Sequence, residues 1–518
     1  MADIAKGIRA FTIGTAISRV LGLVRESVFA YLFGAGMTTD AFNAAFRIPN
    51  LFRDLFAETA LSAAFIPVLT TEKQKGKDKQ NLLASNVFNI LLIVVGIIVI
   101  LGIICSPYFV KIIAFGFGAV PNKLNLTATL TAVIFPFLLF IAFAAWAMGY
   151  LNTEQEFFIP SLAPAFFNIL SIATPIILYM YLVKHGVDPI FGMAIGVTIG
   201  GLMQFLIQIP RLYKKGFRYR FYINFKDPSL KKIFKLFIPV AIGLAASRIN
   251  VTVDIFLVSL LAERSMTWLN YAFRIMHLPL GLFGIAVGTV ALPTISKYVA
   301  EKKYGEVRST LFDSLKLVFF LTVSSAVIIA FLSYPITRII YERGMFTPFD
   351  TYATTQALIL YIIGIPFVAG IRNVAAVFYA YRDAKTPMYA SFVAVAVNIV
   401  LNLLLMRIIG FRAFPLSTTI SSFVNLAILF HYLPRKVGRF KFLPLVKYFV
   451  LLAIAACAAG LTAMVINDFL VSAIGLTFFE QILNLLISGS IGLAIFYSLC
   501  LILGLDEAKD FLKRLVKR

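Results

Sequence analysis

The stretch Asn43–Ile48, with the sequence NAAFRI, returns as Asn270–Ile275, with the sequence NYAFRI. Three further matches keep almost the same separation, and they are Ser18-Arg19 with Ser247-Arg248, Pro67 with Pro293, and Asn168 with Asn398. All four separations lie between 226 and 230 residues. Four matches in register indicate an internal repeat. Its period is much longer than that of solenoid repeats and corresponds to half of a transporter.

The composition places this repeat in a membrane. Of the 518 residues, 60% are apolar and 14% are charged, and the mean hydropathy is +0.91. A soluble domain is about 45–50% apolar and about 25% charged. Apolar stretches of roughly 20 residues, the length that spans a bilayer, recur along the chain. The composition therefore excludes a set of soluble domains and predicts an all-α, polytopic membrane protein.

The apolar pattern predicts fourteen transmembrane helices joined by short connections. The predicted spans cover residues 10–34, 40–70, 82–110, 126–150, 157–183, 188–210, 236–262, 268–296, 312–336, 352–381, 387–408, 413–433, 444–467 and 477–504. One repeat period contains six spans, so both copies enter the membrane in the same orientation. We predict two parallel six-helix lobes around a central cavity, at residues 1–215 and 216–440, and two extra helices with a basic tail at residues 441–518. Such transporters bind their substrate near the midplane, between the lobes.

Lysine and arginine are distributed unevenly between the two sides of the predicted membrane. The N-terminus, the even-numbered connections and the C-terminal tail hold 32 of the 47, and the odd-numbered connections hold eight. Because cytoplasmic loops carry an excess of Lys and Arg, we predict that both termini are cytoplasmic. The formal charge of +23 then reflects orientation and attraction to anionic membrane lipids. We expect no nucleic-acid partner, since the basic residues are spread over many short connections.

The seven remaining basic residues lie inside predicted spans, and all of them are arginine. They are Arg19, Arg25, Arg47, Arg53, Arg248, Arg274 and Arg372, and the acids in the spans are Glu26, Asp40, Asp54, Glu58 and Asp254. One Arg at the centre of a lipid-facing helix costs about 2.5–3.5 kcal/mol, so seven must face a water-filled cavity or a partner. The excess of two positive charges favours an anionic substrate. The planar donor fork of Arg suits phosphate or carboxylate.

Two alternatives are compatible with parts of this pattern. Ion pairing within helices is one, because Arg19 and Glu26 lie seven residues apart on one helical face, as do Arg47 and Asp54. A membrane-embedded enzyme is the second, but the sequence has no glycine-rich loop followed by Lys-Ser or Lys-Thr and no metal-spaced histidine group. We therefore expect no enzymatic activity.

Several motifs resemble one transporter family. The stretches Ser18–Glu26 (SRVLGLVRE), Phe33–Phe42 (FGAGMTTDAF) and Arg47–Arg53 (RIPNLFR) resemble the opening of the MurJ (MviN) lipid II flippases, within the multidrug/oligosaccharidyl-lipid/polysaccharide exporter superfamily. Tyr271–Gly281 and Gly288–Pro293 resemble later stretches of the family. The resemblance implies a protein of the bacterial inner membrane that moves lipid II, the undecaprenyl-pyrophosphate-linked peptidoglycan precursor, to the outer leaflet by alternating access. It also implies a groove for the lipid tail at the two C-terminal helices, and cell-wall synthesis proteins as candidate partners.

The same resemblance assigns roles to individual residues. The cavity arginines that hold the pyrophosphate would be Arg19, Arg25, Arg53 and Arg274, with Arg47, Arg248 and Glu58 as further substrate-binding candidates, and the gate residues would be Asp40 and Glu26. The family's proposed sodium site would correspond to Asp254, Asn398, Asn402 and Thr418, so that Na⁺ is the expected coupling ion and no other cofactor is expected. Many members carry an acid at the position of Asn402, and its loss should weaken cation binding.

One alternative function is compatible with the same fold, namely ion-coupled export of another lipid-linked oligosaccharide or of a drug. Fold alone does not decide the substrate. The excess of arginine over acidic residues in the spans disfavours cationic drugs, and it leaves other lipid-linked oligosaccharides open.

Overall fold

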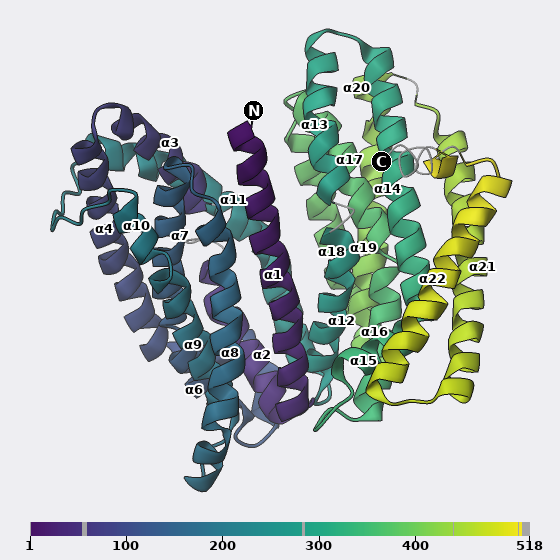
Figure 1. Cartoon of the computed structure of the whole chain (residues 1–518), viewed down its shortest axis with the longest axis horizontal. Coiled ribbons are helices and arrows are strands. Elements are labelled where there is room, and N and C mark those ends of the chain that lie inside the picture. The colour runs from purple at the N-terminus through teal and green to yellow at the C-terminus, as the bar shows by residue number, and fades with distance from the viewer. Residues whose placement is uncertain (1, 54–59, 282–284, 439, 506, 510–518) are drawn as a thin grey trace. The chain divides into compact units, whose positions relative to one another are not determined.

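The structure is a computed structural model that describes residues 2–53, 60–281, 285–438, 440–505 and 507–509, without the side chains of residues 2–12, 60, 242–249 and 285–291. All regular elements in these ranges are helices (Figure 1). The predicted all-α fold is therefore confirmed. The chain divides into two compact units, of which unit 1 contains Met1–Thr267 with Arg343–Met345, and unit 2 contains Trp268–Glu342 with Phe346–Arg518.

Short connections join the helices of unit 1. Their bounds are α1 Ala2–Phe33, α2 Met37–Arg53, α3 Ala60–Gln74, α4 Lys77–Ile104, α5 Ser106–Ile113, η2 Phe115–Ala119, α6 Lys123–Ile134, α7 Phe137–Thr153, α8 Phe158–Lys184, α9 Ile190–Leu206, α10 Ile209–Lys214 and α11 Pro228–Ser259. Within this unit, α8 packs against α1 and α9, and α11 packs against α3. The unit thus includes α11, which the repeat assigns to the second lobe, and the predicted domain boundaries stay a prediction.

Helix α12 (Ser265–Pro279) begins in unit 1 and continues into unit 2. The later helices are α13 Ile285–Ala300, α14 Tyr304–Phe331, α15 Ser333–Tyr341, α16 Pro348–Ile362, α17 Ile365–Ala380, α18 Lys385–Ile409, η4 Gly410–Arg412, α19 Ala413–Tyr432, α20 Pro434–Val437, α21 Phe442–Ile474 and α22 Phe478–Ile502. Helices α21 and α22, the yellow pair in Figure 1, lie side by side, and both pack against α14.

Local sequence explains where several helices begin. The Asp227 carboxylate accepts a hydrogen bond from the backbone N–H of Ser229 at 2.7 Å, and Pro228 occupies the first helical position, so α11 begins there. Capping boxes begin two further helices, and the pairs are Thr347 with Asp350 for α16 and Thr477 with Glu480 for α22.

The helices repeat at the spacing that the sequence motifs predict. Helices α4, α5 and α8 begin at residues 77, 106 and 158, and α14, α15 and α18 begin 227 residues later, at residues 304, 333 and 385. The paired prolines also occupy corresponding helices, since Pro67 lies in α3 and Pro293 in α13. The repeated motifs are therefore carried by helices that recur in the same order.

Nine helical segments in the described ranges are long and apolar enough to cross a membrane. They are Lys77–Ile104, Lys123–Thr153, Phe158–Lys184, Ile190–Lys214, Tyr304–Phe331, Pro348–Ala380, Lys385–Val437, Phe442–Ile474 and Phe478–Ile502. The segment Lys385–Val437 contains two predicted spans. The four predicted spans outside these segments, at residues 10–34, 40–70, 236–262 and 268–296, hold all the span arginines except Arg372. Their charge lowers their hydropathy, and the total of fourteen stays a prediction.

Polar contacts sort the connections within each unit by odd and even number. Asp40, at the first connection, contacts Lys123 of the third at 3.1 Å. Glu154, in the fourth connection, contacts Lys77 of the second at 2.8 Å. In unit 2, the even-numbered connections meet where Lys436 pairs with Asp383. Contacts of this kind require a chain that reverses direction at each predicted span.

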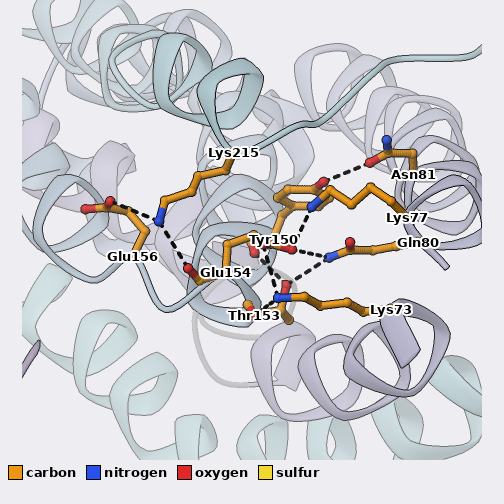
Figure 2. A network of polar contacts seen from close by, with 9 residues as sticks. All are labelled: Lys73, Lys77, Gln80, Asn81, Tyr150, Thr153, Glu154, Glu156 and Lys215. Carbon is orange, nitrogen blue, oxygen red and sulfur yellow. Dashed lines mark hydrogen bonds and ion pairs between the residues drawn. The ribbon is translucent and has the colours of Figure 1, made fainter. Parts of the chain in front are cut away.

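Glu154 holds together the even-numbered end of unit 1 (Figure 2). Its carboxylate accepts hydrogen bonds from Lys77 Nζ and Gln80 Nε2, both at 2.8 Å, and forms an ion pair with Lys73 Nζ at 3.1 Å. Burial raises the pKa of the Glu154 carboxyl, but the hydrogen bonds from Lys77, Gln80 and Lys73 outweigh burial and lower this pKa below its ordinary value of 4.5. The ionised carboxylate thereby ties α3 and α4 to the end of α7.

Two neighbouring contacts extend this network. The Tyr150 hydroxyl donates to Asn81 Oδ1 at 2.8 Å, and Lys215 Nζ donates to the Glu154 carbonyl at 3.3 Å (Figure 2). Lys215 also lies 3.9 Å from the Glu156 carboxylate. The sixth connection is therefore attached to the fourth at the same end of the unit.

We expect Glu154→Gln to lower the thermal unfolding temperature of the purified protein at neutral pH, by the equivalent of about 1 kcal/mol, because it removes a charge shared by two lysines. A carboxyl whose pKa is lowered on folding stabilises the folded state above its ordinary pKa, and this stabilisation is lost as the pH falls through the lowered value. The difference between wild type and variant should therefore shrink below about pH 4.5.

Asp78→Asn is the matched control for this measurement. Asp78 pairs with Arg220 in an exposed position, with side-chain exposures of 82% and 55%. Exposed ion pairs contribute little, so we expect almost no change in unfolding temperature. Equal effects of the two substitutions, or a pH-independent difference for Glu154→Gln, would contradict the role given to Glu154.

Candidate functional site

Arg25 is a buried arginine of the predicted site. It lies in α1 with 8% of its surface exposed, and its Nη2 and Nε atoms donate to Glu26 Oε1 at 2.7 and 3.2 Å. The guanidinium also lies 5.3 Å from the ring centroid of Phe167, on α8. A carboxylate and an aromatic face thus fix the orientation of this cation within unit 1.

Arg19 occupies a different environment on the same helix. Its side chain is exposed, and it forms no ion pair with any residue that the structure describes. The predicted pair between Arg19 and Glu26 is therefore wrong, and Glu26 pairs with Arg25 instead. Seven residues correspond to about 10.5 Å along a helix, whereas side-chain pairs form three or four residues apart.

Helix α2 carries the next two candidates, Arg47 and Arg53, which are both partly buried. Pro49 lies between them inside the helix. The predicted partner of Arg47, Asp54, and the substrate-binding candidate Glu58 lie outside the described residues. The pair between Arg47 and Asp54 therefore stays a prediction.

The remaining arginines are divided between the units. Arg248 lies in α11 of unit 1, with its side chain outside the described part of the structure. In unit 2, Arg274 is partly buried in α12, and Arg372 is exposed in α17. A chamber shared by arginines of both units stays a prediction.

Asp40, a predicted gate residue, is almost completely buried and fully engaged in hydrogen bonds. Its carboxylate accepts from the backbone N–H groups of Arg264 and Thr267 at 2.8 and 3.0 Å, and from the Thr267 hydroxyl at 2.7 Å. Lys123 Nζ donates to Oδ2 at 3.1 Å, and only 2% of the Lys123 residue is exposed. Asp40 therefore caps the first turn of α12 and ties it to α2 and α6.

Sequence reasoning did not identify Lys123 as a partner of Asp40. The two residues are 83 positions apart, and Lys123 was assigned only to a connection. The available indication was that both residues fall at odd-numbered connections, which lie on the same side of the membrane. Glu26, the second predicted gate residue, pairs instead with a substrate-binding candidate, Arg25.

The predicted sodium ligands are brought together only in part. Asn398 and Asn402 are buried one turn apart on α18, and Asn402 Nδ2 donates to Asn398 Oδ1 at 3.1 Å. The Thr418 hydroxyl donates to the Phe414 carbonyl within α19. Asp254, the single carboxylate of the set, belongs to unit 1 and accepts from Asn250 at 3.4 Å.

The chemistry of this donor set fits a weak cation site. The three candidates in unit 2 are neutral, and an amide at residue 402 donates a hydrogen bond where an ionised acid would only accept one. Hard cations prefer carboxylate oxygens. Binding of Na⁺ therefore stays a prediction.

Comparison with known proteins identifies relatives along most of the chain. The family model described as lipid II flippase MurJ matches residues 29–484. The probable lipid II flippase MurJ of Vibrio cholerae serotype O1 is 36% identical over 424 residues, which are 80% of each chain. The lipid II flippase MurJ of Burkholderia cenocepacia is 32% identical over 421 residues, covering 80% of this chain and 81% of the relative.

Solved structures agree with this assignment. A structure of lipid II flippase MurJ in an inward closed conformation matches with a TM-score of 0.75 and 30% identity, covering 96% of this chain and 99% of that chain. An inward-facing multidrug resistance MATE family transporter of the MOP superfamily matches with a TM-score of 0.64 and 12% identity, covering 83% and 98%, which is a likeness of fold alone. This chain belongs to the lipid II flippase MurJ family.

Proposed function

We propose that this protein moves lipid II from the inner to the outer leaflet of the bacterial inner membrane. Membership of the MurJ family supports the substrate. The observation within the structure that carries the proposal is Arg25, a buried and oriented guanidinium about 12 Å from the end of α1. Such a cation in a membrane helix is costly unless it binds an anion.

The orientation of the protein in the membrane belongs to the same proposal. The excess of Lys and Arg in the even-numbered connections supports a cytoplasmic location for both termini. The contacts between Glu154 and the lysines of the second connection support one common face for those connections. Lipid II would then be captured from the face that carries this network.

Arg25 binds the pyrophosphate in the proposed mechanism. In the structure, Glu26 occupies two donors of the guanidinium, and it lowers the cost of burying the cation. An arriving pyrophosphate competes with Glu26 for the same planar donor fork. Neutralisation of the arginines allows the halves of the transporter to close around the head group, while the lipid tail stays in the bilayer, and reopening to the opposite side releases it.

Asp40 holds the gate in this mechanism. Its hydrogen bonds to Arg264 and Thr267 fix the start of α12, and Lys123 compensates its charge. Opening requires these contacts to break together, because a half-broken network leaves a buried charge without its partner. The cluster therefore favours two discrete arrangements of this end of α12.

We expect Arg25→Ala and Arg274→Ala to slow lipid II flipping at least tenfold, because each removes a charge-assisted contact worth about 1.5–3 kcal/mol. The measurement is the rate at which labelled lipid II becomes accessible at the opposite leaflet of proteoliposomes. Exposed Arg220→Gln is the control and should leave the rate unchanged.

Folding is controlled with the double variant Arg25→Gln/Glu26→Gln. Removing Arg25 alone leaves the buried Glu26 carboxylate without this partner, which destabilises proteins by about 3–5 kcal/mol. The double variant removes both charges and should restore the unfolding temperature without restoring flipping. Restored flipping in the double variant would assign Arg25 a structural role only.

We expect Asp40→Asn to lower both the unfolding temperature and the flipping rate, because it leaves the buried Lys123 ammonium without a counter-charge. Adding Lys123→Met should recover most of the stability and little of the flipping rate. Thermal unfolding and flipping of the two single variants and the double variant form a complete cycle. Additive losses in stability would show that the two residues do not act as a pair.

We expect an imposed membrane potential to change the flipping rate, because each elementary charge that crosses the membrane corresponds to about 2.3 kcal/mol per 100 mV. A potential negative on the side of the arginine-rich cavity should return the empty protein and speed turnover. The measurement uses proteoliposomes with a potassium gradient and valinomycin. Replacing Na⁺ by choline should have a smaller effect, since the candidate sodium ligands of unit 2 are neutral. Equal rates with and without the potential would rule out this coupling.

A further inference from the structure

Unit 2 contains a cavity of about 280 Å³ between α15 and the pair α21 and α22. Helical spacing explains how its lining is built. On α21, Met464, Asn467, Asp468 and Val471 follow one another at the spacing of a single helical face. The candidate arginines of the substrate site do not contribute to this lining. The cavity is therefore a separate feature of the fold.

The deepest polar group of the cavity is Asn484. Only 1% of this residue is exposed, and its Nδ2 atom donates to the Gly475 carbonyl at 3.1 Å. Its Oδ1 atom is buried and accepts no hydrogen bond from the described residues. A buried acceptor without a donor costs free energy, so a ligand that supplies an N–H or O–H group would be favoured here.

Two opposite charges also line the cavity. Arg338, on α15, is 29% exposed and pairs through Nε with Glu342 at 3.1 Å. Asp468, on α21, is exposed at the surface and presents a carboxylate. The lining thus offers one cation and one carboxylate beside the neutral acceptor of Asn484.

The cavity lies near the depth at which lipid head groups meet hydrocarbon. Helix α21 has 33 residues and is about 50 Å long, which exceeds a hydrocarbon core of about 30 Å by about 10 Å at each end. Asn467 lies seven residues, or about 10 Å, before the end of α21. Two apolar lining residues, Tyr334 and Met464, are 39% and 41% exposed, so the cavity borders the lipid-facing surface.

We propose that this cavity binds the phosphoethanolamine head group of a membrane phospholipid. The phosphate pairs with Arg338, and the ammonium group donates hydrogen bonds to Asp468 and to Asn484 Oδ1. A zwitterion matches one cation and one carboxylate. The volume is small even for a small-molecule site, so it accommodates a head group while the acyl chains lie along exposed apolar side chains.

The same chemistry predicts selectivity among lipids. Phosphatidylcholine carries a quaternary ammonium without N–H groups, so it cannot donate to Asn484 Oδ1. Phosphatidylglycerol has no cation for Asp468. A bound phosphatidylethanolamine would join α15 to α21 and α22, beside the apolar contacts of Ile328, Leu332 and Ala463.

Native mass spectrometry of the purified protein tests the proposal, with dioleoylphosphatidylethanolamine, dioleoylphosphatidylcholine and dioleoylphosphatidylglycerol added at equal concentrations. We expect phosphatidylethanolamine to be retained with about tenfold higher affinity than the two competing lipids. Asp468→Asn should reduce this preference by about tenfold. Asp313→Asn, an exposed acid on α14 away from the cavity, is the matched control and should leave it unchanged.

Two further arms separate the remaining interpretations. Asn484→Leu replaces the buried acceptor with an apolar side chain of similar size, and it should also abolish the preference while the unfolding temperature without lipid reports on folding. Glycerophosphoethanolamine, which has no acyl chains, should bind much more weakly than the lipid. Equal retention of the three lipids, or unchanged retention by Asp468→Asn, would overturn the proposal, and equal affinity for the tail-less compound would overturn a membrane lipid as the ligand.

Discussion

Charge burial in an apolar environment governs how the arginine-bearing helices pack. Removing an ion from water costs several kcal/mol unless partners replace the lost hydration. Asp40 is compensated by two backbone N–H groups, one hydroxyl and one ammonium, and Arg25 by a carboxylate and an aromatic ring. Each compensation requires specific neighbours at hydrogen-bond or ring-contact distance, so the charged residues determine the contacts of α1, α2, α6 and α12.

The repeat explains how a largely apolar chain presents these charges. Corresponding helices recur at a spacing of 227 residues, and the motif around Arg47 in α2 recurs around Arg274 in α12. The most apolar helices lie elsewhere and supply the membrane-spanning framework. Charge is thereby concentrated on a few helices, while the polar networks at Glu154 and Asp383 hold the even-numbered connections within each unit.

Sequence reasoning predicted the features that depend on local pattern. Apolar period and length predicted the helical class, and the motifs predicted the repeat and the family. Features that depend on tertiary contacts were not accessible. Glu26 pairs with Arg25 and not with Arg19, because reach along a helix decides the partner. Lys123 meets Asp40 across 83 residues, and the cavity at Asn484 exists only when three helices pack together.

The lipid-sized hollow beside α15 also bears on the ancestry of the chain. Helix α15 has a counterpart, α5, in which Lys111 stands 227 residues before Arg338. Lys111 is exposed, whereas Arg338 lines the hollow because α21 and α22 pack beside it. Duplication of a six-span gene followed by fusion of a terminal hairpin accounts for this asymmetry. The later acquisition converted a superficial basic residue, inherited by both copies, into part of an enclosed recess in one of them.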